Sequence, residues 1–197
     1  MLDSALDHAR ANRDRYLDQL IEFLRIPSIS TLSENKPDIQ RAAEWLAVQM
    51  KRIGMRNVQV MPTDGNPVVF GEWLEAGSSP PTVLVYGHYD VQPVDPIDLW
   101  ESDPFTPVVR DGKLYARGSS DDKGQMFLHI KALESLLASG GSPVNVKMLF
   151  EGEEEIGSTN IGPFVLAHTE LLAADTGLVS DSRIIDSETP SLVYALR

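Results

Sequence analysis

A short apolar stretch near the middle of the chain ends in an imidazole and a carboxylate, in the sequence Val83-Leu-Val-Tyr-Gly-His-Tyr-Asp90. The β-branched and aromatic residues before Gly87 are typical of a buried strand. In open α/β sheets, ligands bind beyond the carboxyl ends of the strands. The stretch therefore predicts a buried strand that presents His88 and Asp90 at the ligand-binding edge of a sheet.

Helical and extended patterns alternate along the rest of the chain. Helices are expected over 4–25, 38–53, 124–139 and 161–173, and further strands over 58–60, 68–70, 144–150, 177–180 and 192–196. A hairpin is expected over 108–115, around the pair Asp111-Gly112. This order predicts an α/β fold with a mostly parallel sheet flanked by helices.

The composition excludes several classes of site and partner. The net charge of −12 argues against binding to nucleic acid or to anionic membranes. Because the chain has no cysteine, it can form neither disulfides nor thiolate metal sites. The sequence has neither a signal-peptide pattern at its start nor an apolar run of the roughly 20 residues that a membrane-spanning helix needs. We therefore expect a cytoplasmic protein.

Further carboxylates follow the other predicted strands. Residues Glu153–Glu155 come after the strand at 144–150, Asp181 follows the strand at 177–180, and Asp121-Asp122 precedes a helix. Parallel strands place their carboxyl ends on one rim of the sheet. Imidazole with several carboxylates suits zinc, manganese or cobalt, and a cation would relieve the repulsion between the carboxylates.

Taken singly, each motif also fits an ordinary solvated loop. A His-x-Asp pair is a weak signal, and acidic residues before a helix are favourable whether or not they bind a ligand. The remaining histidines, His8, His129 and His168, lie in predicted helices and are interpreted as structural or surface residues. The joint placement of the acidic motifs after buried strands nevertheless predicts a metal-dependent hydrolase.

Three stretches together resemble the M20 metallopeptidase family, and most of all its carnosinase-type and bacterial dipeptidases. They are Gly-His-Tyr-Asp-Val-Gln-Pro at 87–93, Tyr-Ala-Arg-Gly-Ser-Ser-Asp-Asp-Lys-Gly at 115–124 and Glu-Gly-Glu-Glu-Glu-Ile-Gly-Ser at 151–158. The resemblance implies a zinc-peptidase catalytic domain with two Zn²⁺ ions per complete site, although Mn²⁺ or Co²⁺ would also suit these ligands. It also implies a cis peptide bond between Asp121 and Asp122.

By the same resemblance, the metal ligands are His88, Asp121, Glu155 and Asp181. His88 and Asp181 would bind one zinc and Glu155 the other, while Asp121 bridges both. Aspartate at 181 is typical of the family's dipeptidases and aminopeptidases, whereas its deacylases and carboxypeptidases usually have glutamate there.

The two catalytic residues implied by the resemblance are Glu154, the general base, and Asp90, which orients the imidazole of His88. Glu153 matches no family role and is interpreted as a surface residue or a neighbour of the ligands. The implied reaction is zinc-dependent hydrolysis of peptide bonds in dipeptides or short peptides by a water that two metals activate.

The family also has a histidine ligand far downstream and an inserted lid domain that mediates dimerisation. The chain has no histidine after His168, and Arg197 falls about where the lid insertion would begin. We therefore expect residues 1–197 to be the amino-terminal part of a catalytic domain, without the lid and without the remainder of that domain. This part should be inactive alone, and the full-length protein should form a homodimer. Two alternatives stay open: an M20 deacylase or carboxypeptidase that acts on N-acyl amino acids, and a non-catalytic metal-binding fragment, against which Glu154 argues.

Overall fold

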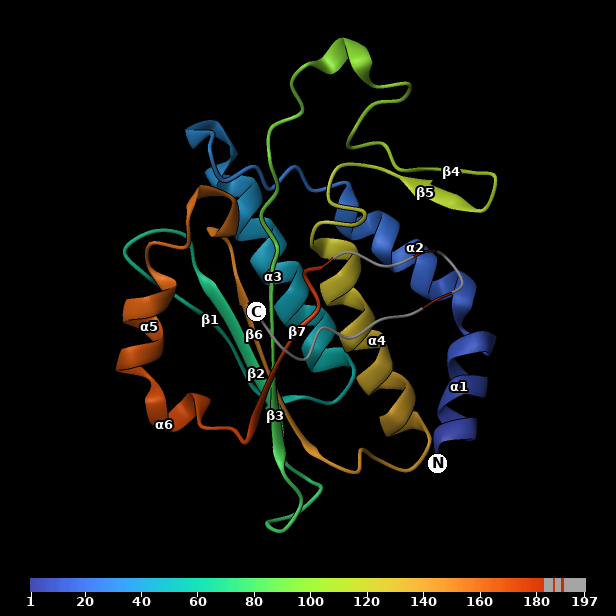
Figure 1. Cartoon of the computed structure of the whole chain (residues 1–197), viewed down its shortest axis with the longest axis vertical. Coiled ribbons are helices and arrows are strands. Elements are labelled where there is room, and N and C mark those ends of the chain that lie inside the picture. Colours follow the sequence, from blue (N-terminus) through green and yellow to red (C-terminus); the bar gives the residue numbers. More distant parts are fainter. Residues whose placement is uncertain (183–185, 187–188, 190–197) are drawn as a thin grey trace.

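The structure of the chain is a computed structural model, and it describes residues 1–182, 186 and 189 (Figure 1). The strand expected over 192–196 lies outside these described residues. The main helices are α1 (Leu2–Ala11), α2 (Arg13–Leu24), α3 (Lys36–Arg52), α4 (Lys123–Ala138), α5 (Ile161–Ala167) and α6 (Thr169–Leu172). None of the helices in the described part of the chain is both long and apolar enough to cross a bilayer.

The strands form a central sheet and a small hairpin. They are β1 (Arg56–Met61), β2 (Val68–Trp73), β3 (Thr82–His88), β4 (Val108–Arg110), β5 (Lys113–Tyr115), β6 (Asn145–Glu151) and β7 (Thr176–Val179). In the described residues the central sheet has the order β1-β2-β6-β3-β7, while β4 and β5 pair with each other as the predicted hairpin.

The predicted α/β architecture is confirmed, and the sheet is mixed. Strand β3 pairs in parallel with β6 on one side and with β7 on the other. The pairs β1–β2 and β2–β6 are antiparallel. A connection of only six residues, 62–67, joins β1 to β2, and so short a link permits antiparallel pairing but not a parallel crossover.

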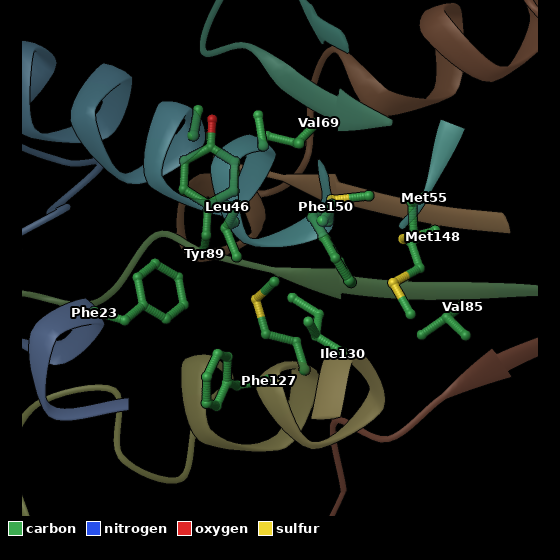
Figure 2. Packing of buried hydrophobic residues seen from close by; sticks show 14 of the residues in the cluster. Phe23, Leu46, Met55, Val69, Val85, Tyr89, Phe127, Ile130, Met148 and Phe150 are labelled. Carbon is green, nitrogen blue, oxygen red and sulfur yellow. The ribbon is translucent and has the colours of Figure 1, made fainter. Parts of the chain in front are cut away.

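Alternate residues of the central strands face two different apolar clusters. Val69, Met148 and Phe150 pack with residues of α3 and α4 in the larger cluster (Figure 2). On the opposite face, Phe70 and Leu149 pack in a smaller cluster with residues of α5 and α6. Because β6 carries apolar neighbours on both faces, it is buried over its whole length.

Two of the predicted helices are each divided in two. Asn12 interrupts the helix expected over 4–25, and its side-chain amide donates a hydrogen bond to the His8 carbonyl at 2.8 Å. Such local side-chain to backbone bonds compete with the helical ladder. His168 interrupts the helix expected over 161–173 in a similar way, through a hydrogen bond from its Nδ1 to the Phe164 carbonyl at 2.8 Å.

Phe127 of α4 ties this helix to α2 and α3, because its ring packs against Trp45, which stacks on Phe23. We expect Phe127→Ala to lower the free energy of unfolding by about 3–5 kcal/mol, since it leaves a cavity in the larger cluster. Leu128→Ala, at the next and 65% exposed position, should change it by less than about 0.5 kcal/mol. Urea denaturation followed by circular dichroism measures both values, and equal effects would contradict this packing.

A group of charges also joins α2 to α4. The Glu134 carboxylate accepts hydrogen bonds from Arg15 at 2.6 Å and from Lys131 at 2.8 Å. Burial alone would raise the pKa of Glu134, but these two cations outweigh it and lower the pKa below its usual value. Because the folded-state pKa is the lower one, the ionised carboxylate stabilises the fold at neutral pH, and this stabilisation is lost as the pH falls through the folded-state pKa.

Glu134→Gln should therefore lower the free energy of unfolding by about 1 kcal/mol at pH 7. The difference from the unaltered chain should shrink as the pH falls below 4.5, the usual pKa of this carboxyl group. Urea denaturation at a series of pH values measures the difference. Glu22→Gln, on the exposed face of α2, is the control and should leave the pH profile unchanged. A difference that persists unchanged at low pH would contradict the expected ion pairing.

Candidate metal centre

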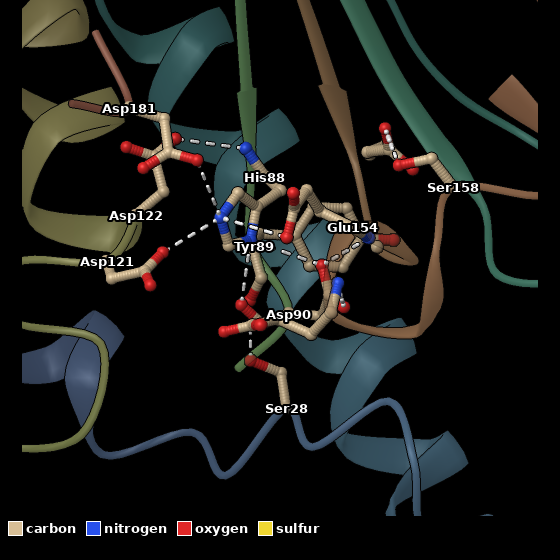
Figure 3. Close-up of polar contacts among 12 residues, drawn as sticks. Ser28, His88, Tyr89, Asp90, Asp121, Asp122, Glu154, Ser158 and Asp181 are labelled. Atoms are coloured by element: carbon tan, nitrogen blue, oxygen red, sulfur yellow. Dashed lines mark hydrogen bonds and ion pairs between the residues drawn. The ribbon is translucent and has the colours of Figure 1, made fainter. Parts of the chain in front are cut away.

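Parallel strand pairing brings the predicted site residues to one edge of the sheet. His88 is the last residue of β3, and it lies opposite Glu151, the last residue of β6. On the other side of β3, Tyr86 lies opposite Val179 of β7. His88 lies two residues after Tyr86, and Asp181 lies two residues after Val179. The register of β3 and β7 therefore places His88 and Asp181 at the same level of the sheet (Figure 3).

Three carboxylates surround one nitrogen of the His88 ring. His88 Nε2 lies 3.1 Å from Asp121 Oδ1, 3.7 Å from Asp181 Oδ2 and 3.9 Å from Glu154 Oε2 (Figure 3). One ligand atom from each of His88, Asp121 and Asp181 lies within 4.8 Å of the other two. An imidazole nitrogen with two carboxylate oxygens is a donor set that suits a divalent cation such as Zn²⁺, Mn²⁺ or Co²⁺.

Asp90 contacts the other nitrogen of the His88 ring and also binds the turn that contains Glu153, Glu154 and Glu155, called the acidic turn below. His88 Nδ1 lies 3.1 Å from the Asp90 carbonyl oxygen and 3.4 Å from Asp90 Oδ1, and both side chains are fully buried. The two Asp90 carboxylate oxygens accept the backbone N–H groups of Glu154, at 3.2 Å, and Glu155, at 3.1 Å. One carboxylate thus fixes the ring orientation and the start of the turn η3 (Glu154–Ile156).

The structure brings together three of the four predicted metal ligands. The fourth, Glu155, lies beside this group and binds a different partner. Its carboxylate accepts a hydrogen bond from Gln92 Nε2 at 2.7 Å, and the same amide lies 3.3 Å from the Glu155 carbonyl oxygen. Gln92 follows the predicted strand by only four residues, yet its type and position gave no sign of this contact.

Asp122 contributes to the site although the family resemblance implies a ligand role only for its neighbour Asp121. Its Oδ2 accepts the backbone N–H of His88 at 3.1 Å. The carboxylate comes so near the strand that a Cβ atom on Gly87 would lie 2.6 Å from this oxygen, which explains the glycine before the histidine. The peptide bond between Asp121 and Asp122 is cis, as predicted.

A second group of polar contacts supports the end of β6. Glu151 is buried and accepts hydrogen bonds from the Tyr86 hydroxyl and, at 2.9 Å, from the Ser158 hydroxyl. Burial raises the pKa of Glu151. Because these donors come from β3 and from the segment after η3, the carboxylate links the two strand ends that carry the site.

The electrostatics of the site favour a bound positive charge. Burial lowers the pKa of His88, but its contact with Asp90 and the charges of Asp122 and Glu154 outweigh this and raise the pKa to about 10. Burial, with smaller effects from Asp181 and Asp121, raises the pKa of Asp122 to about 7. Among the described residues, His88 is the basic side chain that lies within 4 Å of the carboxylates of Asp121, Asp181 and Glu154. The site thus gathers more negative than positive charge.

Comparison with known proteins agrees with this geometry. Residues 84–190, more than half of the chain, match the model of the Peptidase family M20/M25/M40. The chain belongs to this family. The matched range includes His88, Asp121, Glu154, Glu155 and Asp181.

The relatives of this M20 chain include named dipeptidases. It is 32% identical to the Cys-Gly metallodipeptidase dug1 of Schizosaccharomyces pombe, over 100% of the chain and 44% of that protein. The crystal structure of human carnosine dipeptidase 1 matches 93% of the chain with a TM-score of 0.85 at 30% identity, over 42% of that structure. The M20 family metallo-carboxypeptidase Sso-CP2 from Sulfolobus solfataricus matches with a TM-score of 0.79 at 38% identity, over 88% of the chain and 38% of that structure. The M20 chain thus spans less than half the length of these relatives.

Asp90→Ala should loosen the acidic turn of the M20 chain without unfolding the sheet. The amides of Glu154 and Glu155 would lose their charged acceptor, and hydrogen bonds to charged groups contribute about 1.5–3 kcal/mol. We expect these two amides to exchange with solvent at least about tenfold faster, by hydrogen exchange measured with NMR. The amide of Met148, inside β6, is the control and should keep its protection. Unchanged exchange at Glu154 and Glu155 would contradict the role of Asp90.

Proposed function

We propose that the M20 chain takes part in zinc-dependent hydrolysis of peptide bonds in dipeptides or short peptides. The observation that carries the proposal is the convergence of His88, Asp121 and Asp181, with Glu154 beside them, at the carboxyl edge of the sheet. The family membership supports the same chemistry.

The donor set fits the proposed metal. His88, Asp121 and Asp181 would hold one Zn²⁺. As the family resemblance implies, Asp121 with Glu155 would hold a second. When bound, the two ions would lower the pKa of a water molecule and polarise the scissile carbonyl group. Gln92, through its hydrogen bond to Glu155, would orient the carboxylate of that ligand.

Two further carboxylates would handle the proton and the geometry. Glu154 would accept a proton from the attacking water and pass it to the leaving amine, and its carboxylate already lies within 3.9 Å of the His88 ring. Asp90 would keep Nε2 of His88 directed at the metal, because it contacts Nδ1 on the other side of the ring. It would also hold Glu154 in position through the backbone of the turn.

Dipeptides are the proposed substrates for two reasons. Both dug1 of Schizosaccharomyces pombe and human carnosine dipeptidase 1 are named as dipeptidases. By the family resemblance, aspartate at position 181 is also usual in the dipeptidase branch. The second candidate is a carboxypeptidase or a deacylase of N-acyl amino acids, and the 38% identity to a metallo-carboxypeptidase favours it. Turnover of dipeptides and N-acyl amino acids, each measured with added zinc and with a chelator, distinguishes the two.

We also propose that the chain is the amino-terminal part of a larger catalytic domain. It spans 44% of the dug1 relative and 42% of human carnosine dipeptidase 1. By family resemblance, the remaining part would supply a histidine ligand to the second zinc and a lid that forms a homodimer. The 197-residue chain alone should therefore be inactive, and hydrolysis by it that a chelator abolishes and zinc restores would contradict this.

Glu154→Gln, in a protein that carries this chain and the complete set of ligands, should lower kcat by about 100-fold or more. The amide keeps the shape of the side chain but cannot accept the proton, and the zinc content should stay close to normal. Steady-state kinetics and atomic absorption measure the two values. Glu155→Gln is the matched control and should lose zinc. Zinc loss in the Glu154 variant, or full turnover, would show that the two glutamates have exchanged roles.

A further inference from the structure

The first glutamate of the acidic turn, Glu153, is almost completely buried, with 6% of its surface exposed. Its carboxylate accepts three hydrogen bonds. Oε1 accepts the backbone N–H of Asn66 at 2.9 Å, and Oε2 accepts the backbone N–H of Asn160 at 3.3 Å and its side-chain amide at 2.8 Å. A buried carboxylate that accepts three hydrogen bonds is not a solvated surface residue. Of the two interpretations of Glu153, a surface residue or a neighbour of the ligands, the first is therefore wrong.

The partners of Glu153 come from two segments that lie far apart in the sequence. Asn66 belongs to the connection between β1 and β2, and its side-chain amide also donates to the Gly152 carbonyl at 2.6 Å. Asn160 directly precedes α5. The contact is so close that a Cβ atom on Gly65 would lie 1.7 Å from Glu153 Oε1, so only glycine leaves room for the carboxylate there.

Glu153 and Asp90 hold the same turn through different parts of the molecule. Glu153 is the residue directly before η3, and its carbonyl oxygen accepts the N–H groups of Ile156 at 3.1 Å and Ser158 at 2.8 Å. Asp90 accepts the N–H groups of Glu154 and Glu155, the first two residues of η3. The backbone that carries the proposed base is therefore anchored through Asp90 to the segment after β3, and through Glu153 to the β1–β2 connection and the start of α5.

We propose that Glu153 is a positioning residue that fixes the carboxylate of Glu154 for proton transfer, an inference that rests on the proposed peptidase function. Its carboxylate group suits this task because it offers only acceptor oxygens to three donors. Glutamine has nearly the same shape, but it presents one N–H₂ group, which would face either the Asn66 donor or the Asn160 donors. Two donors that face each other in a buried place push the turn out of its position.

Glu153→Gln is the first test, made in the zinc-loaded protein that carries this chain. Displacement of a reacting group by about 1 Å can cost about 100-fold in rate, so kcat should fall by about 10- to 100-fold. KM should change by less than about threefold, because Glu153 touches the turn and not the proposed substrate. An unchanged kcat, or a loss confined to KM, would overturn the proposal.

Gly65→Ala is the second test, because it displaces the Glu153 carboxylate and leaves that residue in the chain. It should lower kcat in the same direction by a smaller factor. Gly162→Ala is the matched control, since a Cβ atom there would meet no other heavy atom within 4 Å, and its kcat should stay unchanged. Equal losses in both variants would overturn the proposal.

Hydrogen exchange gives a readout that does not depend on activity. In Glu153→Gln, the amides of Glu154 and Glu155 should exchange at least about fivefold faster, while that of Met148 inside β6 stays protected. Unchanged exchange at these two amides would overturn the positioning role. An unaltered protein with no peptidase activity would instead refute the proposed function, and the exchange result would still decide whether Glu153 holds the turn.

Discussion

Backbone hydrogen bonds hold β3 parallel to β6 on one side and to β7 on the other, and the candidate metal centre depends on this pairing. Parallel strands end at the same edge of a sheet, so the segments that follow them start side by side. His88, the acidic turn after Glu151 and Asp181 are brought together in this way. The antiparallel strands β1 and β2 lie on the far side of β6 and contribute support to the turn through Asn66.

The site gathers negative charge around one buried imidazole. Three carboxylates lie within 4 Å of His88 Nε2, and a fourth, Asp90, lies at the other ring nitrogen. Such an arrangement is costly for a protein unless a cation or a proton shares the charge. The raised pKa of His88 expresses the same excess of negative charge, whereas burial is the main cause of the raised pKa of Asp122. A divalent cation on this donor set would stabilise the carboxylates in their ionised form.

The three consecutive glutamates 153–155 show how one short motif can supply three different contacts. Glu153 binds donors from the β1–β2 connection and from the residue before α5. Glu154 lies near the imidazole, and Glu155 binds Gln92. Their side chains can reach different partners because they lie in a tight turn, in which successive residues project in different directions. The turn itself keeps its shape because Asp90 accepts two of its backbone N–H groups.

Much of this protein follows from its sequence alone, because apolar periodicity and the position of polar residues after strands are local properties of the chain. They were enough to predict the α/β architecture, the buried strand that leads to His88 and the gathering of polar groups at one edge of the sheet. The resemblance to a known family added the individual ligands His88, Asp121, Glu155 and Asp181. The mixed pairing of the sheet depends on which strands become neighbours, and the breaks at Asn12 and His168 depend on single side-chain bonds. The hydrogen bonds of Asp122, Gln92 and Glu153 join residues that are between 7 and 87 positions apart in the sequence. Only the tertiary structure decides such contacts, because no local pattern specifies which distant donor a carboxylate will meet.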